Sequence, residues 1–199
     1  MTNNLENTRF KMSKNTTMKK MYSAIDNKYV DEMLVPFLKK FNKKDNYFTT
    51  SSCCGRIMLL GADENETKQP KMFVGKWHRK VKFNEVYSLL EKETKHKEIW
   101  LKQESFIFHI VAKNLEYAKK ILELKKELGI RRGGIFIVED GRYIIELIGS
   151  NNISIPIKFD NEIILNKKQI KLIIKKANHK LEKNYKILKD ILKSFLKDL

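Results

Sequence analysis

The sequence predicts an α+β fold, a single compact domain over residues 1–199 with a mixed or antiparallel sheet and a long C-terminal helix packed on it. Three observations support this class. From Asn166 onward the chain follows a continuous helical pattern. Asp140-Gly141 separates two apolar runs, which is a hairpin signal. Residues 105–138 are the one clear strand–helix–strand unit. No Gly-rich nucleotide fingerprint follows a first strand, so a Rossmann-type fold is not expected.

The first third of the chain predicts two helices and two strands. Residues 10–24 read as a basic helix, or else residues 1–25 form a partly ordered basic arm. Residues 28–42 place apolar side chains on one helix face, and Pro36 is expected to kink this helix or shift its start. Two extended pieces around a hydroxyl-rich turn are expected next, at residues 47–51 and 55–60.

The middle of the chain predicts a loop, several strands and two helices. Asn114 is a good N-cap for a helix that ends at Leu128, and Gly129 is a good stop. The remaining elements are a polar loop at 61–70, a strand at 71–77, a short helix at 83–93, a buried strand at 105–112, the hairpin strands at 133–138 and 142–148, and a strand at 153–157.

The last helix has an apolar stripe that should face the sheet, while lysines cover its outer face. The stripe consists of Ile170, Ile173, Ile174, Ala177, Leu181, Tyr185, Leu188, Ile191, Leu192 and Phe195.

Charge predicts a polyanion partner. The net charge is +17, and the excess is concentrated in residues 1–60 and 158–199. Nucleic acid is the most common partner of so basic a folded protein, although a lysine-rich genome would also spread lysine over solvated faces. No apolar run is long enough to span a membrane and no signal peptide is visible, so a soluble cytoplasmic protein is expected. Two adjacent cysteines and four scattered histidines show no metal-ligand spacing, so no metal is expected unless distant residues converge.

The segment Tyr47–Ile57 is the most informative stretch of the chain. It combines hydroxylated residues, two cysteines, Gly55 and Arg56 between apolar flanks. Small hydroxyls supply hydrogen-bond donors and acceptors, Gly55 permits close approach, and Arg56 suits a phosphate, a carboxylate or a base edge. A hydroxyl-rich turn between strands uses the same residues, so composition alone leaves both interpretations open.

Other candidate residues also have two interpretations. Arg131 to Gly134 could bind an anion through backbone amides, or form a helix C-terminal turn. His109 is a candidate base or a core histidine with one hydrogen bond. Trp77, His78 and Arg79 could contact a base and a phosphate, or end a strand. Cys53 could be a nucleophile, but no activating partner is visible in the sequence.

The segment Tyr47–Ile57 resembles the signature of the wybutosine-synthesising tRNA(Phe) N4-methyltransferase family, which has an aromatic-hydroxyl-x-Ser-Ser-Cys-x-Gly-Arg pattern. Cys54 takes the variable place. The matching residues are Thr49, Ser51, Ser52, Cys53, Gly55 and Arg56.

Further matches follow in the family's order over most of the chain. Three positions depart from the pattern: Trp77 replaces a hydroxylated residue before His78, Ser105 replaces a proline, and Gly133 replaces a serine. The matches are Glu104, Phe106, His109, Arg131, Gly134, the run Ile155-Pro156-Ile157, Ala177-Asn178 and Asn184.

The resemblance implies an α+β methyltransferase that uses S-adenosylmethionine and methylates N4 of a demethylwyosine-type base at position 37, in the anticodon arm of tRNA(Phe). The acceptor nitrogen must lose a proton at some stage, and His109, His78, a carboxylate or water could accept it. The residues that it implies to line the cofactor or base site are Thr49, Ser51, Ser52, Cys53, Gly55, Arg56, Glu104, Arg131 and Gly134.

Two other functions stay open at this point. The three departures, at Trp77, Ser105 and Gly133, are compatible with a tRNA-binding protein that has the same fold and no catalysis. A thiol enzyme that uses Cys53 is the third possibility. The sequence is compatible with a monomer or a weak dimer.

Overall fold

The computed structural model of the chain describes residues 2–63 and 72–199. The chain divides into two units, each built from separated segments. Unit 1 contains the residues up to Cys54 together with 106–150 and 187–199, and unit 2 contains 55–105 and 151–186.

A four-stranded antiparallel sheet forms the centre of unit 1. The strand order is β1-β5-β7-β6, so β1 and β6 are the two edges. The hairpin of β6 and β7 turns at Asp140-Gly141, where Gly141 has a φ of 72°. The strands are β1 (Tyr47–Cys53), β5 (Ile107–Ala112), β6 (Ile135–Glu139) and β7 (Arg142–Ile148).

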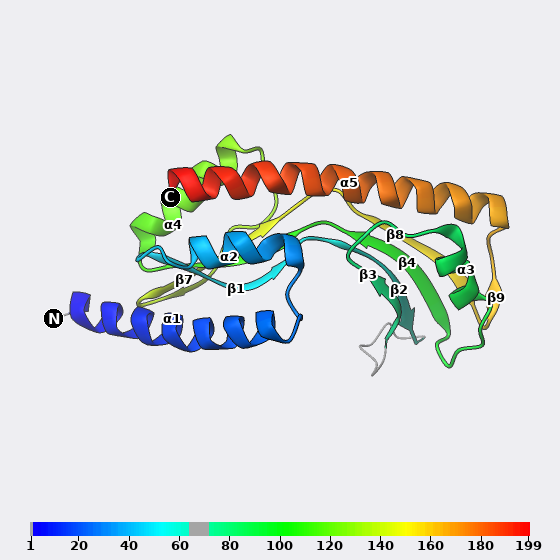
Figure 1. The fold of residues 1–199 in the computed structure, drawn as a ribbon, viewed down its shortest axis with the longest axis horizontal. Helices are drawn as coiled ribbons and strands as arrows, with labels where there is room; N and C mark the ends of the chain where they lie inside the picture. The colour runs from blue at the N-terminus through cyan, green and yellow to red at the C-terminus, as the bar shows by residue number, and fades with distance from the viewer. Residues whose placement is uncertain (1, 64–71) are drawn as a thin grey trace. The chain divides into compact units, whose positions relative to one another are not determined.

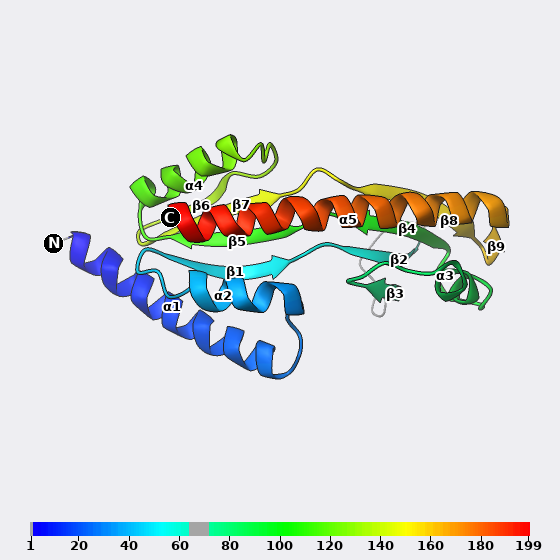
Figure 2. The same cartoon turned by 45° about the horizontal axis from the view of Figure 1, so that its top comes forward.

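Helices cover both faces of this sheet. On one face α1 (Thr2–Asp26) packs on β1 and β7, with Phe10 against Phe48 (Figure 1). On the other face lie α2 (Val35–Phe41), which follows the 3-10 turn η1 (Glu32–Leu34), and α4 (Leu115–Glu127). Figure 2 shows the C-terminal end of the last helix between α2 and α4. Since alternate residues of a strand point to opposite faces, β5 directs His109 and Val111 toward the α1 face.

Two β-bulges interrupt the edge strands of unit 1. In β1 the register shifts between Thr49 and Ser51, and in β6 it shifts between Ile135 and Ile137. Bulges redirect side chains and are frequent beside active sites. Thr50 and Phe136 are therefore the two positions where the edges of this sheet deviate from regular pairing.

A five-stranded antiparallel sheet, with the order β3-β2-β4-β8-β9, forms unit 2. The helix α3 (Phe83–Leu90) and the first part of α5 (Lys167–Asp198) pack on it through one apolar core, which includes Leu59, Val86 and Ile174. The strands are β2 (Arg56–Ala62), β3 (Phe73–Trp77), β4 (Glu98–Glu104), β8 (Ile153–Phe159) and β9 (Glu162–Ile163).

Local signals in the sequence explain where several helices begin and end. The side chain of Asn114 accepts a hydrogen bond from the backbone N–H of Tyr117 at 3.1 Å, so Asn114 caps α4. Gly129 ends that helix with a φ of 69°. Pro36 occupies the first turn of α2, where its missing N–H costs nothing, so it shifts the start of the helix as predicted.

The α+β class, the antiparallel strands and the long C-terminal helix are confirmed, and α1 confirms the helix predicted for residues 10–24. Two details were wrong. Gly61 and Ala62 belong to β2 rather than to the predicted polar loop at 61–70. Residues 64–70 of that loop, and residue 71 of the strand predicted at 71–77, lie outside the described residues. The strands β4 and β9 were not predicted. None of the helices in the described ranges is long and apolar enough to cross a membrane.

Candidate functional site

A pocket of about 460 Å³ lies in unit 1 beside the edge strand β1. The four consecutive hydroxylated residues of β1 form one wall, and the second half of α1 and the segment after it form the other. The lining residues are Thr17, Lys20, Met21, Ala24, Tyr29, Val30, Leu38, Thr49, Thr50, Ser51 and Ser52. The residues that drew attention in the sequence thus line a real concavity.

Thr49 is held in this wall by the side chain of Asn42. The backbone N–H of Thr49 donates to Asn42 Oδ1 at 2.7 Å, and Asn42 Nδ2 donates to Thr49 Oγ1 at 3.0 Å. Both residues are buried. Because Thr49 is fully engaged, its role is to position β1, while the exposed Thr50 and Ser51 lie on the open part of the strand.

Ser51, His109 and Glu146 form a hydrogen-bonded chain across three strands. Ser51 Oγ lies 2.9 Å from His109 Nδ1, and His109 Nε2 lies 3.1 Å from Glu146 Oε1. Strand register creates this chain, because His109 is paired with Ser51 on one side and with Glu146 on the other. The His109 and Glu146 side chains are 25% and 30% exposed, so the chain remains accessible from solvent.

Serine, imidazole and carboxylate in this order can move a proton. When Nε2–H donates to the carboxylate, Nδ1 is free of hydrogen and accepts from the serine hydroxyl. A proton that reaches Ser51 Oγ can pass to His109 Nδ1, and the imidazolium formed is then stabilised by Glu146. Ser51 also lines the pocket, so it links the pocket to the histidine.

Phe136 lies against the same histidine. Its ring centroid is 5.1 Å from that of His109, and 53% of the residue is exposed. Exposure of an aromatic ring next to a polar chain is unfavourable for packing alone, because Phe normally buries most of its apolar surface. The bulge in β6 at this position turns the ring toward His109.

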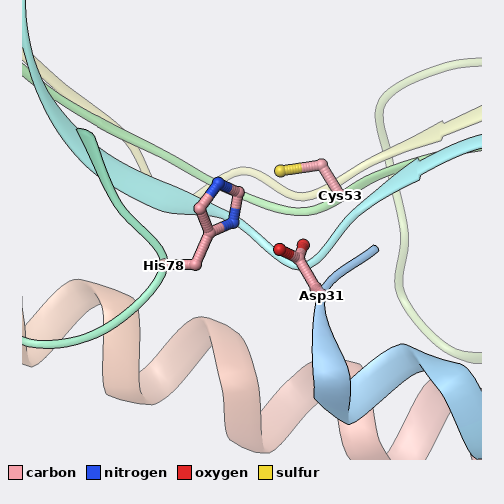
Figure 3. A group of neighbouring side chains, drawn as sticks. All are labelled: Asp31, Cys53 and His78. Carbon is pink, nitrogen blue, oxygen red and sulfur yellow. The ribbon is translucent and has the colours of Figure 1, made fainter. Parts of the chain in front are cut away.

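Asp31 fixes the end of β1. Its Oδ2 accepts a hydrogen bond of 2.8 Å from the backbone N–H of Cys54, and Cys53 is the last residue of the strand. Figure 3 shows the side chains of Asp31 and Cys53. His78, drawn in the same figure, belongs to unit 2, where it follows β3 and its carbonyl accepts a 2.7 Å hydrogen bond from the Tyr185 hydroxyl.

Arg56 and Glu104, two further candidates, pair with each other in unit 2. They are cross-strand neighbours on β2 and β4, with Arg56 Nε and Nη2 2.9 and 2.8 Å from Glu104 Oε2. The Arg56 guanidinium also lies 5.4 Å from the ring centroid of Phe73. The Arg56 guanidinium group is held by the carboxylate of Glu104 and the ring of Phe73, which fixes the orientation of its remaining N–H groups.

Gly55 has a packing role within unit 2. Its φ is 100°, and a Cβ atom there would lie 2.7 Å from Asn184 Nδ2 and 2.8 Å from the Glu104 carbonyl oxygen. Asn184 is fully buried and accepts a hydrogen bond from the Ser105 hydroxyl. The serine that departs from the family pattern thus has its own partner in this structure.

The two adjacent glycines in the turn after α4 have different surroundings. Gly133 has a φ of 85°, and a Cβ there would lie 2.1 Å from the carbonyl oxygen of Glu146. At Gly134 a Cβ atom would have no neighbour within 4 Å among residues 2–63 and 72–199. Position 133 therefore has to be glycine, because a larger residue would collide with β7, whereas packing does not require glycine at position 134. Arg131 is exposed on the same turn.

The predicted residues divide between the two units, and within each unit one pair of them is in direct contact. Ser51 and His109 are in direct contact in unit 1, where Thr49, Ser52, Cys53, Arg131 and Gly134 also lie, and Arg56 contacts Glu104 in unit 2. Sequence reasoning missed Glu146, Phe136, Asn42, Lys20 and Tyr29. The hairpin register could have identified Glu146, since it fixes which β7 residue opposes His109.

Sequence comparison places the chain with a group of RNA-modifying enzymes. A family model described as Methyltransferase TYW3 matches residues 12–197. A protein of Methanocaldococcus jannaschii is 35% identical over 182 residues, which are 90% of this chain and 93% of that protein. A protein of Pyrococcus abyssi is 32% identical over 182 residues, with 90% and 92% covered. Each is named a tRNA(Phe) 7-((3-amino-3-carboxypropyl)-4-demethylwyosine(37)-N(4))-methyltransferase, the second with the number 1.

Solved structures share the fold. The PH1069 protein from Pyrococcus horikoshii matches with a TM-score of 0.88 at 28% identity, and 97% of each chain is covered. A hypothetical protein from Aeropyrum pernix matches with a TM-score of 0.73 at 25% identity, over 85% of this chain and 99% of that chain.

Proposed function

The chain belongs to the Methyltransferase TYW3 family, and from this premise we propose that it transfers a methyl group from S-adenosylmethionine to N4 of a demethylwyosine-type base at position 37 of tRNA(Phe). The structural observation that carries the proposal is the pocket in unit 1, whose wall leads through Ser51 into the chain of His109 and Glu146. The enzyme acts in the cytoplasm on the anticodon arm.

The pocket suits the methyl donor by size and by chemistry. Its volume of about 460 Å³ lies within the range of small-molecule sites, roughly 300–1,000 Å³. Hydroxyls of β1 offer hydrogen bonds, Lys20 offers a partner for a carboxylate, and Ala24, Val30 and Leu38 offer apolar contact. When bound, S-adenosylmethionine supplies an electrophilic methyl group on a sulfonium.

The protein supplies alignment and a proton path. S-adenosylmethionine held in this pocket would supply the methyl group, and the acceptor nitrogen would lose a proton as it is methylated. Ser51 Oγ accepts that proton while its own passes to His109 Nδ1, and Glu146 stabilises the imidazolium. The positive charge that begins on the sulfonium ends on the imidazole, so the reaction is balanced. Alignment itself can supply about 7–11 kcal/mol of the barrier in favourable cases.

Phe136 provides a platform for the flat acceptor. RNA bases that are taken out of a stack are held on aromatic side chains, and the tricyclic base has a large π surface. The exposed ring of Phe136 lies next to the histidine that accepts the proton. A base stacked on this ring would lie beside His109, the same side chain that the Ser51 hydroxyl contacts.

The three departures from the family pattern have structural explanations, so they give no support to a protein without catalysis. The Ser105 hydroxyl donates to Asn184, Gly133 is required by the carbonyl of Glu146, and Trp77 packs against Gly75 and the core of unit 2. None of these three departures removes a side chain from the hydrogen-bonded series of Ser51, His109 and Glu146.

Two measurements test this function. Mass spectrometry of tRNA(Phe) from a strain that lacks the gene should show the unmethylated base, and fully methylated base there would refute the proposal. Calorimetry should detect binding of S-adenosylmethionine to the purified protein. Binding of tRNA without any binding of the donor would favour the non-catalytic alternative.

A Lys20→Ala variant with unchanged donor affinity would exclude the contact assigned to Lys20.

A further inference from the structure

We propose that a lysine-lined groove in unit 2 binds the sugar–phosphate backbone of the RNA substrate, as a second RNA contact on a different unit from the methyl-transfer pocket. The groove has a volume of about 490 Å³ and lies between α5 and the segment that precedes α3. Its lining residues are Lys80, Val81, Phe83, Lys171, Ile174, Lys175, Asn178, His179 and Glu182. This inference rests on the tRNA substrate proposed above and identifies where else that substrate is held.

The groove is a built feature of the fold. Asn178 on α5 accepts a hydrogen bond from the Val81 N–H at 2.9 Å and donates to the Val81 carbonyl at 2.8 Å. This double contact fixes the segment that carries Lys80 against the helix that carries Lys171 and Lys175. Val81 and Ile174 are buried in the core below. The cations on both walls are therefore held by rigid elements.

Aromatic rings set the position of Lys171 and of one further cation, Lys167, at this end of α5. The Nζ of Lys171 lies 5.0 Å from the ring centroid of Phe83, and the Nζ of Lys167 lies 5.0 Å from that of Tyr87. The two rings are themselves stacked, 5.0 Å apart. A cation over a ring keeps its charge while losing part of its freedom, so less entropy is lost when it binds a phosphate.

Charge in the groove favours a polyanion. Among the residues that line it, Lys80, Lys171 and Lys175 are basic and Glu182 is the one acidic residue. Glu182 Oε1 lies 2.6 Å from Lys80 Nζ, and both side chains are more than half exposed. Exposed ion pairs of this kind contribute little stability, so a phosphate can compete for Lys80. Neighbouring Arg79 is paired with Glu85 instead, at 2.6 Å.

Lysine is suited to the RNA backbone rather than to its bases. An ammonium group makes point contacts with phosphate oxygens and does not read a base edge. The groove should therefore hold the RNA without regard to its sequence, while the pocket in unit 1 handles the modified base. Affinity for tRNA should depend on salt through the counterions that these lysines release.

Salt-dependent binding of hypomodified tRNA(Phe) tests this inference with matched variants. The double variant Lys171→Ala/Lys175→Ala removes two groove cations, and Lys176→Ala/Lys183→Ala removes two exposed lysines of the same helix outside the groove. The groove variant should bind roughly 25- to 60-fold more weakly at 0.1 M salt, with a salt slope lowered by about 1.4–1.8. The control variant should change affinity by about threefold or less.

A third variant tests the sign of the effect. Glu182→Gln removes the negative charge of the groove and releases Lys80, so tRNA should bind more tightly and with a steeper salt slope. Equal weakening of tRNA binding by the two double variants would refute a binding role of the groove and indicate a general effect of charge. Unchanged binding by the groove variant, while wild type binds, would also overturn it. Failure of wild type to bind tRNA at all would instead refute the proposed function.

Discussion

Glu146 should be essential for the rate of methyl transfer although it is not among the residues that line the pocket beside β1. Its carboxylate is 3.1 Å from His109 Nε2, and this contact favours the tautomer in which Nδ1 can accept a proton from Ser51. Glu146→Gln keeps the shape of the side chain and removes its charge. The amide can also donate to Nε2, which would place the hydrogen on Nδ1 and block the path.

The size of the effect follows from the geometry of the pair. Two unit charges at 3.1 Å interact by about 1.3 kcal/mol in bulk water and about 5 kcal/mol at an effective dielectric constant of about 20. His109 and Glu146 are 25% and 30% exposed, so an intermediate value applies. A loss of about 2–3 kcal/mol corresponds to a roughly 30- to 150-fold lower kcat.

Single-turnover methylation of hypomodified tRNA(Phe) with saturating S-adenosylmethionine measures this effect directly. The KM for either substrate should change little, because Glu146 stabilises a charge that forms during the reaction. Glu139→Gln is the matched control, since it makes the same change on the same hairpin, where Glu139 pairs with Arg142 at 3.4 Å. A Glu146→Gln enzyme with the rate of wild type would refute the proton path.

Four further results are expected. Phe136→Ala should raise the KM for tRNA by about 5- to 150-fold, because base stacking is lost. Val138→Ala, which changes an exposed residue of the same strand, should leave the KM unchanged, and equal effects of the two variants would exclude stacking of the base on Phe136. Gly133→Ala should lower the free energy of unfolding by about 2–4 kcal/mol in denaturant melts, while Gly134→Ala changes it by less than about 1 kcal/mol; similar values would contradict the steric argument. Burial raises the pKa of Tyr47 from 10.0 to about 12, so its contribution to stability is complete below pH 10 and is lost between pH 10 and 12, and Tyr47→Phe should make the alkaline loss smaller. Cys53→Ser should keep most of the activity, and a trapped covalent adduct on Cys53 would instead support a thiol enzyme.

Elements with strong local signals could be predicted from the sequence. Asn114, Gly129 and Pro36 act within a few residues of their own positions, so their effect on helix ends does not depend on distant contacts. The strand β4 was missed although its buried residues alternate regularly from Ile99 to Gln103. The charged residues Glu98, Lys102 and Glu104 at its alternate positions lowered its apparent hydrophobicity. Its position as a central strand comes from pairing with β2 and β8.

The candidate site could be predicted only in part, because it depends on register. The resemblance identified Ser51 and His109, but nothing in their sequence spacing indicates that they touch. Two bulges, at Thr50 and at Phe136, determine which side chains surround the histidine. Gly55 and Arg56 were expected to contact a ligand; within unit 2, Gly55 leaves no room for a Cβ atom beside Asn184, and Arg56 pairs with Glu104.

The most direct test of the account is the transfer of a labelled methyl group from S-adenosylmethionine to hypomodified tRNA(Phe) by wild type and by His109→Ala. We expect label on the base at position 37 with wild type, and a rate lower by about 10²- to 10⁴-fold in the variant, because a general base is lost. Rapid transfer by the variant would contradict the role of His109. No transfer by wild type, under conditions in which both substrates bind, would contradict the proposed reaction.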